Sequence, residues 1–215
     1  MTKYEPVEIA EDAPYVNALL FQTMLGIEEV LGKNGLKVVL QSSGLQRYVD
    51  NPPPNDLGFG AEAREFAYLN AAIEEFTGRA GKGMLQRIGR SGFQWGIKEQ
   101  SGAMGLAGLA LKALPRRLRM RAVLLGLRKG LMDNVPYGLI DVRDEGGMFV
   151  FTDYACVICH TRHDDKSLCH MYVGTLSEAM AYATGKNFRE FEVVETHCRA
   201  RGDGYCRFEI REKAP

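Results

Sequence analysis

The sequence has 215 residues, of which 46% are hydrophobic, and its 27 basic side chains balance 27 acidic ones. A formal net charge of zero excludes a global electrostatic attraction to nucleic acid or to an anionic membrane. No apolar run reaches the roughly 18 residues of a membrane-spanning helix, and the acidic first stretch is unlike a secretory signal. We therefore expect a cytoplasmic protein whose five cysteines are thiols or metal ligands rather than disulfides.

The first half of the sequence is predicted to be helical. Apolar residues recur at the spacing of an α-helix in several stretches, which glycines or prolines separate. These stretches cover 15–32, 36–49, 61–77 and 84–97, and three prolines lie at 52–54. A basic stretch over 112–129 is expected to form one more amphipathic helix, with a kink at Pro115. Residues 1–14 are polar and are expected to form an N-terminal arm.

The second half is predicted to contain four strands and one helix. Aromatic and β-branched residues gather in four short runs bounded by turn residues. The runs cover 137–142, 148–154, 191–196 and 205–210, and the helix covers 169–184. Helices that precede hairpins, rather than alternate with strands, favour an α+β fold. We expect helices packed on one face of a twisted antiparallel four-stranded sheet, in a single domain over 15–211.

The last predicted hairpin gathers potential metal ligands. Its turn at 201–204 contains two glycines, which permit the positive φ angles of a tight turn, so Cys198 and Cys206 lie close together. Glu195 can join them if its strand twists or bulges. Cys169 opens the preceding helix, where the helix dipole favours a thiolate. If that helix end packs over the hairpin, the four residues close a tetrahedral site, which is typical of structural zinc.

Cys156 and Cys159 form a C-x-x-C-H motif with His160 at the end of the second strand. The motif matches c-type haem attachment, but such attachment requires an export route that the sequence does not indicate. A thioredoxin-type redox pair would instead open a helix after a parallel strand. Zinc, an iron–sulfur cluster and a pair of ordinary thiols remain as alternatives for this motif.

These residues also carry a resemblance to a known family. The pattern C-x25-E-x2-C-x7-C, the turn R-G-D-G and the ending C-R-F-E-I resemble the 4-vinyl reductase domain, most specifically over 153–210. Members occur in bacteriochlorophyll synthesis, in archaeal hydrocarbon-binding proteins and in the sensor modules of phenol-responsive activators. Their fold is similar to that of TRAPP subunits and of haem nitric-oxide sensor domains. The resemblance implies a homodimer. It also implies that the single domain has two parts, a helical part at 15–135 and a zinc-binding, β-rich part at 136–211.

In the aromatic sensors of that family, three cysteines and a glutamate hold zinc. The resemblance places these ligands at Cys169, Glu195, Cys198 and Cys206. The segment between Gly185 and Cys198 is longer than in those sensors, and other side chains could compete for the ion. The rivals are Cys156, Cys159, His170 and His197.

The family encloses an apolar small molecule between helices and sheet. The candidate contacts are Phe66, Phe93, Trp95, Tyr137 and Phe149. The small, apolar stretch 102–114 could be a lid over this pocket or a contact surface for a partner. Stretch 102–129 could also lie on a membrane surface, although a core-packed helix with a solvated basic face is the simpler interpretation. No DNA-reading module accompanies the basic charge, so no nucleic-acid partner is expected.

Two functions remain open from the sequence. The first is a cytoplasmic binding or sensor domain for a hydrophobic small molecule, stabilised by a structural zinc ion and without catalytic residues. The alternative is an enzyme or accessory protein in the reduction of a tetrapyrrole vinyl group. That reaction needs an electron source, and because the sequence has no dinucleotide-binding fingerprint, only an iron–sulfur cluster could supply it.

Overall fold

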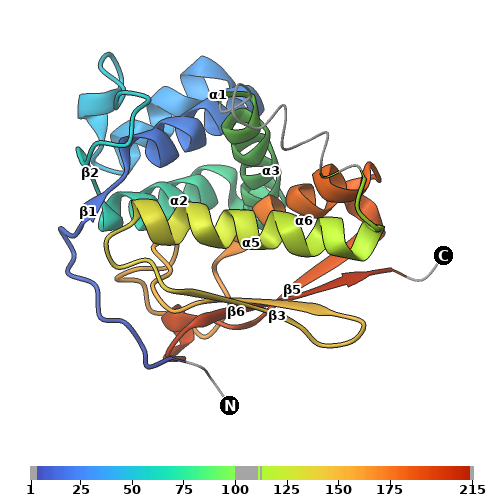
Figure 1. Ribbon diagram of the computed structural model, residues 1–215. Coiled ribbons are helices and arrows are strands. Elements are labelled where there is room, and N and C mark those ends of the chain that lie inside the picture. The colour runs from blue at the N-terminus through green and yellow to red at the C-terminus, as the bar shows by residue number, and fades with distance from the viewer. Residues whose placement is uncertain (1–3, 100–110, 112, 214–215) are drawn as a thin grey trace.

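A computed structural model describes residues 4–99, 111 and 113–213 of the protein (Figure 1). The helices are α1 (Asn17–Ser42), α2 (Ala63–Thr77), α3 (Gly81–Glu99), α5 (Arg116–Asn134) and α6 (His170–Thr184). The strands are β1 (Pro14–Tyr15), β2 (Ala61–Glu62), β3 (Ile140–Asp144), β4 (Phe149–Asp153), β5 (Phe191–His197) and β6 (Cys206–Glu212). Most of the stretch 102–114, predicted as a lid or contact surface, lies outside the described residues.

A four-stranded antiparallel sheet forms one layer and the helices form the other (Figure 1). The strand order is β3-β4-β6-β5, so the two predicted hairpins pair through their second strands. Phe151 of β4 stands opposite Phe208 of β6, and Tyr172 of α6 packs on both rings, with centroid distances of 5.5 and 5.0 Å. The α+β fold and the single domain predicted from the sequence are confirmed. β1 and β2 form a separate two-stranded ribbon beside α2.

The predicted helix boundaries need two corrections. α1 spans both stretches predicted as helices, but Gly32 has a non-helical φ of 74° and ψ of 170°, so it divides α1 into two helical segments as predicted from the sequence. The second segment ends at Ser42 rather than at 49, and Gln46–Tyr48 forms a separate 3₁₀ turn. Pro115 does not kink the basic helix but stands just before it as its N-cap, a place where its missing N–H group costs nothing.

Helices α3 and α6 cross with their backbones in close contact, and glycine makes this possible. A Cβ atom at Gly89 would lie 2.0 Å from the carbonyl oxygen of Met171, and one at Gly174 would lie 2.0 Å from that of Gln86. The hydroxyl of Thr175 donates a hydrogen bond to the carbonyl of Gly89 (3.2 Å) across the same crossing. Because α6 starts directly after Cys169, this contact fixes where that thiol stands relative to α3.

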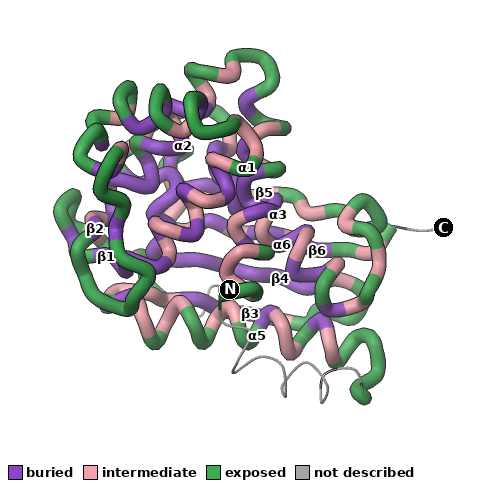
Figure 2. The backbone as a smooth tube through the Cα atoms, turned by 90° about the horizontal axis from the view of Figure 1, so that it is seen from above, coloured by how far each residue is buried: buried purple, intermediate pink, exposed green. Residues whose placement is uncertain are grey.

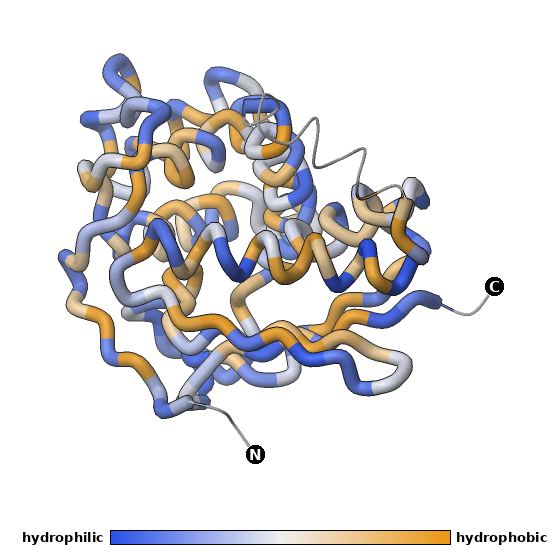
Figure 3. The backbone as a smooth tube through the Cα atoms, viewed as in Figure 1, coloured by the Kyte–Doolittle hydropathy of each residue, from blue (hydrophilic) through white to orange (hydrophobic). Residues whose placement is uncertain are grey.

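The core lies between the helices and the sheet, where one face each of α1, α3 and α6 and the whole of β4 are buried (Figure 2). Polar and apolar residues alternate along α5, which covers the sheet at the protein surface (Figure 3). The N-terminal arm runs down to the far end of the sheet (Figure 1). There, Tyr4 packs edge-on against Tyr154, and the guanidinium of Arg199 donates to the carbonyl of Val7 (2.8 Å). Within the described ranges, the helices lack the length and hydropathy needed to traverse a bilayer.

Candidate metal centre and ligand cavity

Five cysteines and one glutamate converge where the helix layer meets one end of the sheet. Cys156 and Cys159 lie in the loop after β4, and Cys169 caps α6. Cys198 follows β5 and Cys206 begins β6, so the terminal hairpin supplies both. Glu195 reaches them because the pairing of β5 with β6 shifts register between Glu195 and His197, which is the bulge that the sequence required. All five thiols are free and buried.

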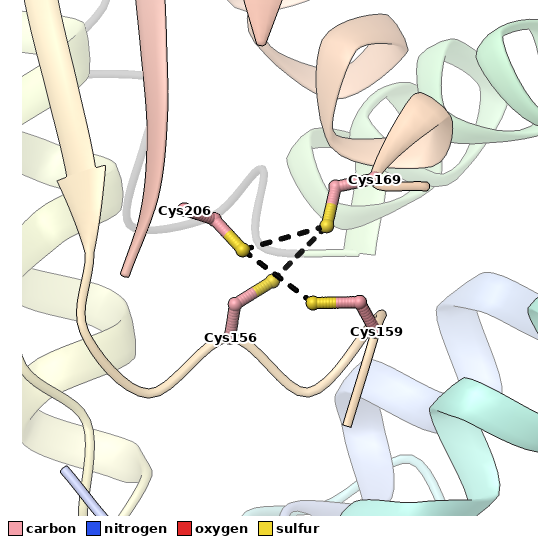
Figure 4. A group of neighbouring side chains, drawn as sticks. All are labelled: Cys156, Cys159, Cys169 and Cys206. Atoms are coloured by element: carbon pink, nitrogen blue, oxygen red, sulfur yellow. Dashed lines mark hydrogen bonds between the residues drawn. The ribbon is translucent and has the colours of Figure 1, made fainter. Parts of the chain in front are cut away.

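The donor atoms fall into two groups of four, and within each group all atoms lie within 4.8 Å of one another. The first group is Cys156, Cys159, Cys169 and Cys206, and the second is Cys169, Glu195, Cys198 and Cys206. Figure 4 shows the sulfur atoms of the first group turned toward one another. The second group is the ligand set that the family resemblance implied. Cys156 and Cys159, the rivals predicted for one ligand position, instead lie beside the complete ligand set.

The spacing of the sulfur atoms fits a single tetrahedral ion in each group. Metal–sulfur bonds of about 2.3 Å give a tetrahedron with edges of about 3.8 Å. The Cys169 sulfur lies 3.6 Å from that of Cys156 and 3.6 Å from that of Cys206. The Cys159 and Cys206 sulfurs are 3.4 Å apart, and those of Cys169 and Cys198 are 4.0 Å apart. These four distances bracket the expected edge.

Burial and contacts with other thiols shift the pKa values of the cysteines in opposite directions. Burial raises the pKa of Cys169 and of Cys206 well above the usual thiol value. Thiol donors lower the pKa of Cys156, chiefly Cys159 and then Cys169 and Cys206. The contact with Cys159 raises the pKa of Cys198, but donation from Cys169 and Cys206 outweighs it and leaves a value of about 6. The cluster therefore already contains thiolate, the form that binds metal.

Glu195 is held in the cluster by one oxygen and leaves the other free. Its Oε2 accepts the backbone N–H of Cys169 at 2.9 Å. Its Oε1 is buried and has no hydrogen-bond partner among the described residues. Burial first, and then the nearby Cys198 thiolate, raise the pKa of this carboxyl to about 9. An unpartnered carboxylate oxygen in such a place is costly unless a cation meets it.

Two further backbone contacts lie beside the thiols. The N–H of Arg199 donates to the sulfur of Cys206 (3.4 Å) and stabilises negative charge there. The N–H of Cys198 donates to a carboxylate oxygen of Asp203 (2.8 Å), which orients the turn of the hairpin. The two rival histidines take no part in either group of donors. His197 instead packs against the ring of Tyr205, and His170 lies half-buried at the start of α6.

A second feature, a cavity of about 570 Å³, lies between α1, α3, α5 and the loop that carries Cys156. Its volume is within the range of about 300–1,000 Å³ usual for small-molecule sites. Phe66 and Phe93, two of the five predicted ligand contacts, line it. Trp95 lies outside the described lining and donates its indole N–H to Glu29, while Phe149 lies under the guanidinium of Arg117. Tyr137 is half-buried and is also outside the described lining.

The cavity wall is mainly apolar, with a few polar groups beside the cysteine loop. Asp153, at the end of β4, is buried, and burial raises the pKa of its carboxyl to about 6. Tyr172 of α6 is buried as well, and its hydroxyl lies next to the carboxyl of Asp153. Neither residue is among the ligand contacts predicted from the sequence. For Asp153 the available signal was an aspartate at the end of an apolar strand, shortly ahead of the C-x-x-C motif.

The segment that contains the paired strands β4 and β6 and the cysteines matches a known protein family. Residues 149–212 match the family model of the 4-vinyl reductase domain. The matched segment runs from β4 to β6 and contains all six donor residues, so the resemblance expected from the sequence is confirmed. No curated protein sequence matches the chain.

Solved structures similar to this chain are H-NOX domains. An oxygen-binding H-NOX domain related to soluble guanylate cyclases, in its oxygen complex, is 14% identical with a TM-score of 0.57. That alignment covers 93% of this chain and 95% of the other. An H-NOX protein from S. oneidensis in its Fe(II)NO state is 10% identical with a TM-score of 0.54, over 90% of this chain and 99% of the other. At such low identity the likeness shows that the fold is shared. The family resemblance predicted this shared fold with haem nitric-oxide sensor domains.

The residues around the cavity do not fit haem. Haem iron takes an axial histidine, cysteine, methionine or tyrosine, and haem carries two propionates. The four histidines of the sequence all lie outside the described lining, which also contains neither lysine nor arginine to meet a propionate. Cys156, Met171 and three tyrosines do line the cavity, namely Tyr15, Tyr172 and Tyr182. The Cys156 sulfur is engaged with the other thiols, and burial raises the pKa of Tyr15 and of Tyr172, which disfavours a phenolate ligand. The H-NOX fold is therefore shared, but the described lining offers no histidine for an iron and no cation for a propionate.

Proposed function

We propose that this protein is a binding or sensor domain that encloses an apolar small molecule beside a structural metal site. The cavity between the helices and the sheet carries this proposal. Its size and apolar wall suit a small hydrophobic molecule, and its few polar groups suit one hydrogen-bonding group on that molecule. We further propose that the protein acts in the cytoplasm, as a homodimer, and without catalysis of its own.

The polar end of the cavity indicates the chemistry of the ligand. The hydroxyl of Tyr172, which lies next to Asp153 in the cavity wall, can donate to or accept from a bound hydroxyl or carbonyl group. Asp153, with its raised pKa, lies in the same wall and can donate when protonated or accept when ionised. A molecule that is apolar except for one alcohol, phenol or carbonyl group satisfies these groups and fills the remaining volume.

Zinc is the metal that the cysteine spacing supports best. Thiolate ligands with one carboxylate and no open position are typical of structural zinc. An iron–sulfur cluster places several irons and sulfides between its cysteines, so their sulfur atoms stand farther apart than the edge of a single-ion tetrahedron. Separations of 3.4–4.0 Å between Sγ atoms are consistent with one ion in each group of donors. The tetrapyrrole-reduction alternative depends on such a cluster, so no observation favours it.

A cavity-filling substitution tests the binding function. A Cβ atom at Gly92, which lines the cavity, would meet only the carbonyl oxygen of Gln22 within 4 Å, at 3.8 Å. We expect the Gly92→Phe variant to bind the neutral fluorescent probe N-phenyl-1-naphthylamine at least tenfold more weakly, while its metal content stays unchanged. Gly83→Phe on the same helix is the matched control, because Gly83 is exposed and a Cβ atom there meets nothing within 4 Å.

Equal probe affinity in the wild type and the Gly92→Phe variant would contradict the proposed cavity. Native mass spectrometry of the freshly purified protein then identifies the natural ligand. We expect a co-purified mass of a few hundred daltons that is absent from the Gly92→Phe variant and present in the Gly83→Phe control.

A further inference from the structure

The metal centre has more donors than one ion can use. Structural zinc takes four ligands, whereas six side chains offer a sulfur or a carboxylate oxygen here. If one ion takes Cys169, Glu195, Cys198 and Cys206, then Cys156 and Cys159 remain as buried thiols 3.4–3.6 Å from ligand sulfurs. An ion in the other group would leave Oε1 of Glu195 buried without a partner among the described residues.

The way in which the six donors are grouped resolves this excess. They form two groups rather than one, and the groups share Cys169 and Cys206. Each group therefore consists of the two shared cysteines and a pair of its own. One pair, Cys156 and Cys159, comes from the loop after β4, and the other, Glu195 and Cys198, comes from the end of β5. A thiolate sulfur has lone pairs enough to bridge two ions, so both groups can be occupied together.

Resting on the metal site of the proposed function, we propose that this chain holds two divalent ions, bridged by the thiolates of Cys169 and Cys206. Each ion is then tetrahedral, with two bridging and two terminal ligands. The bridging sulfurs are 3.6 Å apart, close to the edge of about 3.8 Å that either tetrahedron needs. All six donors are used, and the second ion has both a thiolate and the carboxylate of Glu195 as terminal ligands.

The charge of the assembly supports this arrangement. Five thiolates and one carboxylate carry six negative charges, and two divalent ions reduce the net charge to minus two. A single zinc ion with four thiolates also has a net charge of minus two, so the two-ion centre buries no more net charge than an ordinary structural zinc site. The surroundings supply hydrogen-bond donors: the N–H of Arg199 meets one bridging sulfur, and the N–H of Cys169 meets the carboxylate.

Metal stoichiometry tests the proposal directly. The full chain is purified anaerobically, loaded with excess Zn²⁺, desalted and measured by native mass spectrometry and elemental analysis. We expect two zinc ions per chain. The Cys156→Ser/Cys159→Ser double variant and the Glu195→Gln/Cys198→Ser double variant should each retain one ion, because each loses a different terminal pair.

The wild-type count is decisive even if a variant fails to fold. One ion per chain overturns the two-ion centre and leaves the single structural metal of the proposed function intact. A count of zero ions per chain overturns both the two-ion centre and the single metal site. Loading with ¹¹³Cd²⁺ adds a spectroscopic check. Two cadmium resonances coupled through the shared sulfurs are expected, and a single resonance contradicts the bridged pair.

Discussion

The crossing of α3 and α6 makes a specific prediction about Gly89. Replacing Gly89 by alanine would put a methyl group 2.0 Å from the carbonyl oxygen of Met171 and 3.0 Å from the backbone nitrogen of Thr175. Both neighbours are backbone atoms of a helix, so neither can rotate away. The two helices must move apart by roughly 1.4 Å before the contact becomes an ordinary van der Waals distance.

The expected cost follows from this geometry. Overpacking a close-packed interior costs about 1–3 kcal/mol, and a rigid backbone contact belongs at the upper end of that range or above it. The better helix propensity of alanine returns up to about 1 kcal/mol. We therefore expect Gly89→Ala to lower the free energy of unfolding by about 2 kcal/mol. For a chain of this length that corresponds to a fall in Tm of about 4–8 °C.

Urea unfolding followed by circular dichroism measures this change, with Gly83→Ala as the matched control. Gly83 lies on the same helix, but it is exposed and a Cβ atom there meets nothing within 4 Å. The control should be as stable as the wild type or slightly more stable. If Gly89→Ala proves as stable as Gly83→Ala, the backbone contact between the two helices is not as close as described, and the reasoning is refuted.

Three further predictions concern the site. Cys206→Ala should lose the bound metal and lower the Tm, because the hairpin and α6 both depend on that ligand, and unchanged metal content by elemental analysis would contradict this. Removing the metal with a strong chelator should likewise lower the Tm, and added Zn²⁺ should restore it. A Tm that does not change when the chelator is added would contradict a structural ion. Burial raises the pKa of Asp153 to about 6, so the unfolded chain releases this proton first and stability falls as the pH rises from about 4 to about 7. The asparagine of Asp153→Asn has no proton to release, so the free energy of unfolding of this variant should rise relative to that of the wild type by about 2 kcal/mol between pH 4.5 and pH 7.5. Urea unfolding measures both, and a difference that stays constant with pH would disprove the raised pKa.

Local patterns in the sequence were sufficient to predict the fold. Periodicity located the helices, and the two glycines at 201–204 located the terminal turn, so the sheet and its hairpins could be predicted before the structure was known. The convergence of Glu195 with Cys198 and Cys206 could also be predicted, because a hairpin is a local structure and its register follows from its turn.

Features that depend on packing between distant segments could not be predicted in this way. The loop that carries Cys156 comes within 3.6 Å of Cys169 because α6 docks on the sheet through Tyr172 and crosses α3 at Gly89 and Gly174. Nothing local distinguishes these two glycines from others in the sequence.

Cys156 belongs both to the wall of the cavity and to the thiol cluster. In the proposed two-ion centre, a molecule that presses on this wall would move the sulfur of a terminal ligand. Thermodynamic linkage is reciprocal, so whatever factor the guest applies to the affinity for the ion, the ion applies to the affinity for the guest. Cellular metal supply would then tune the threshold at which the small molecule is detected.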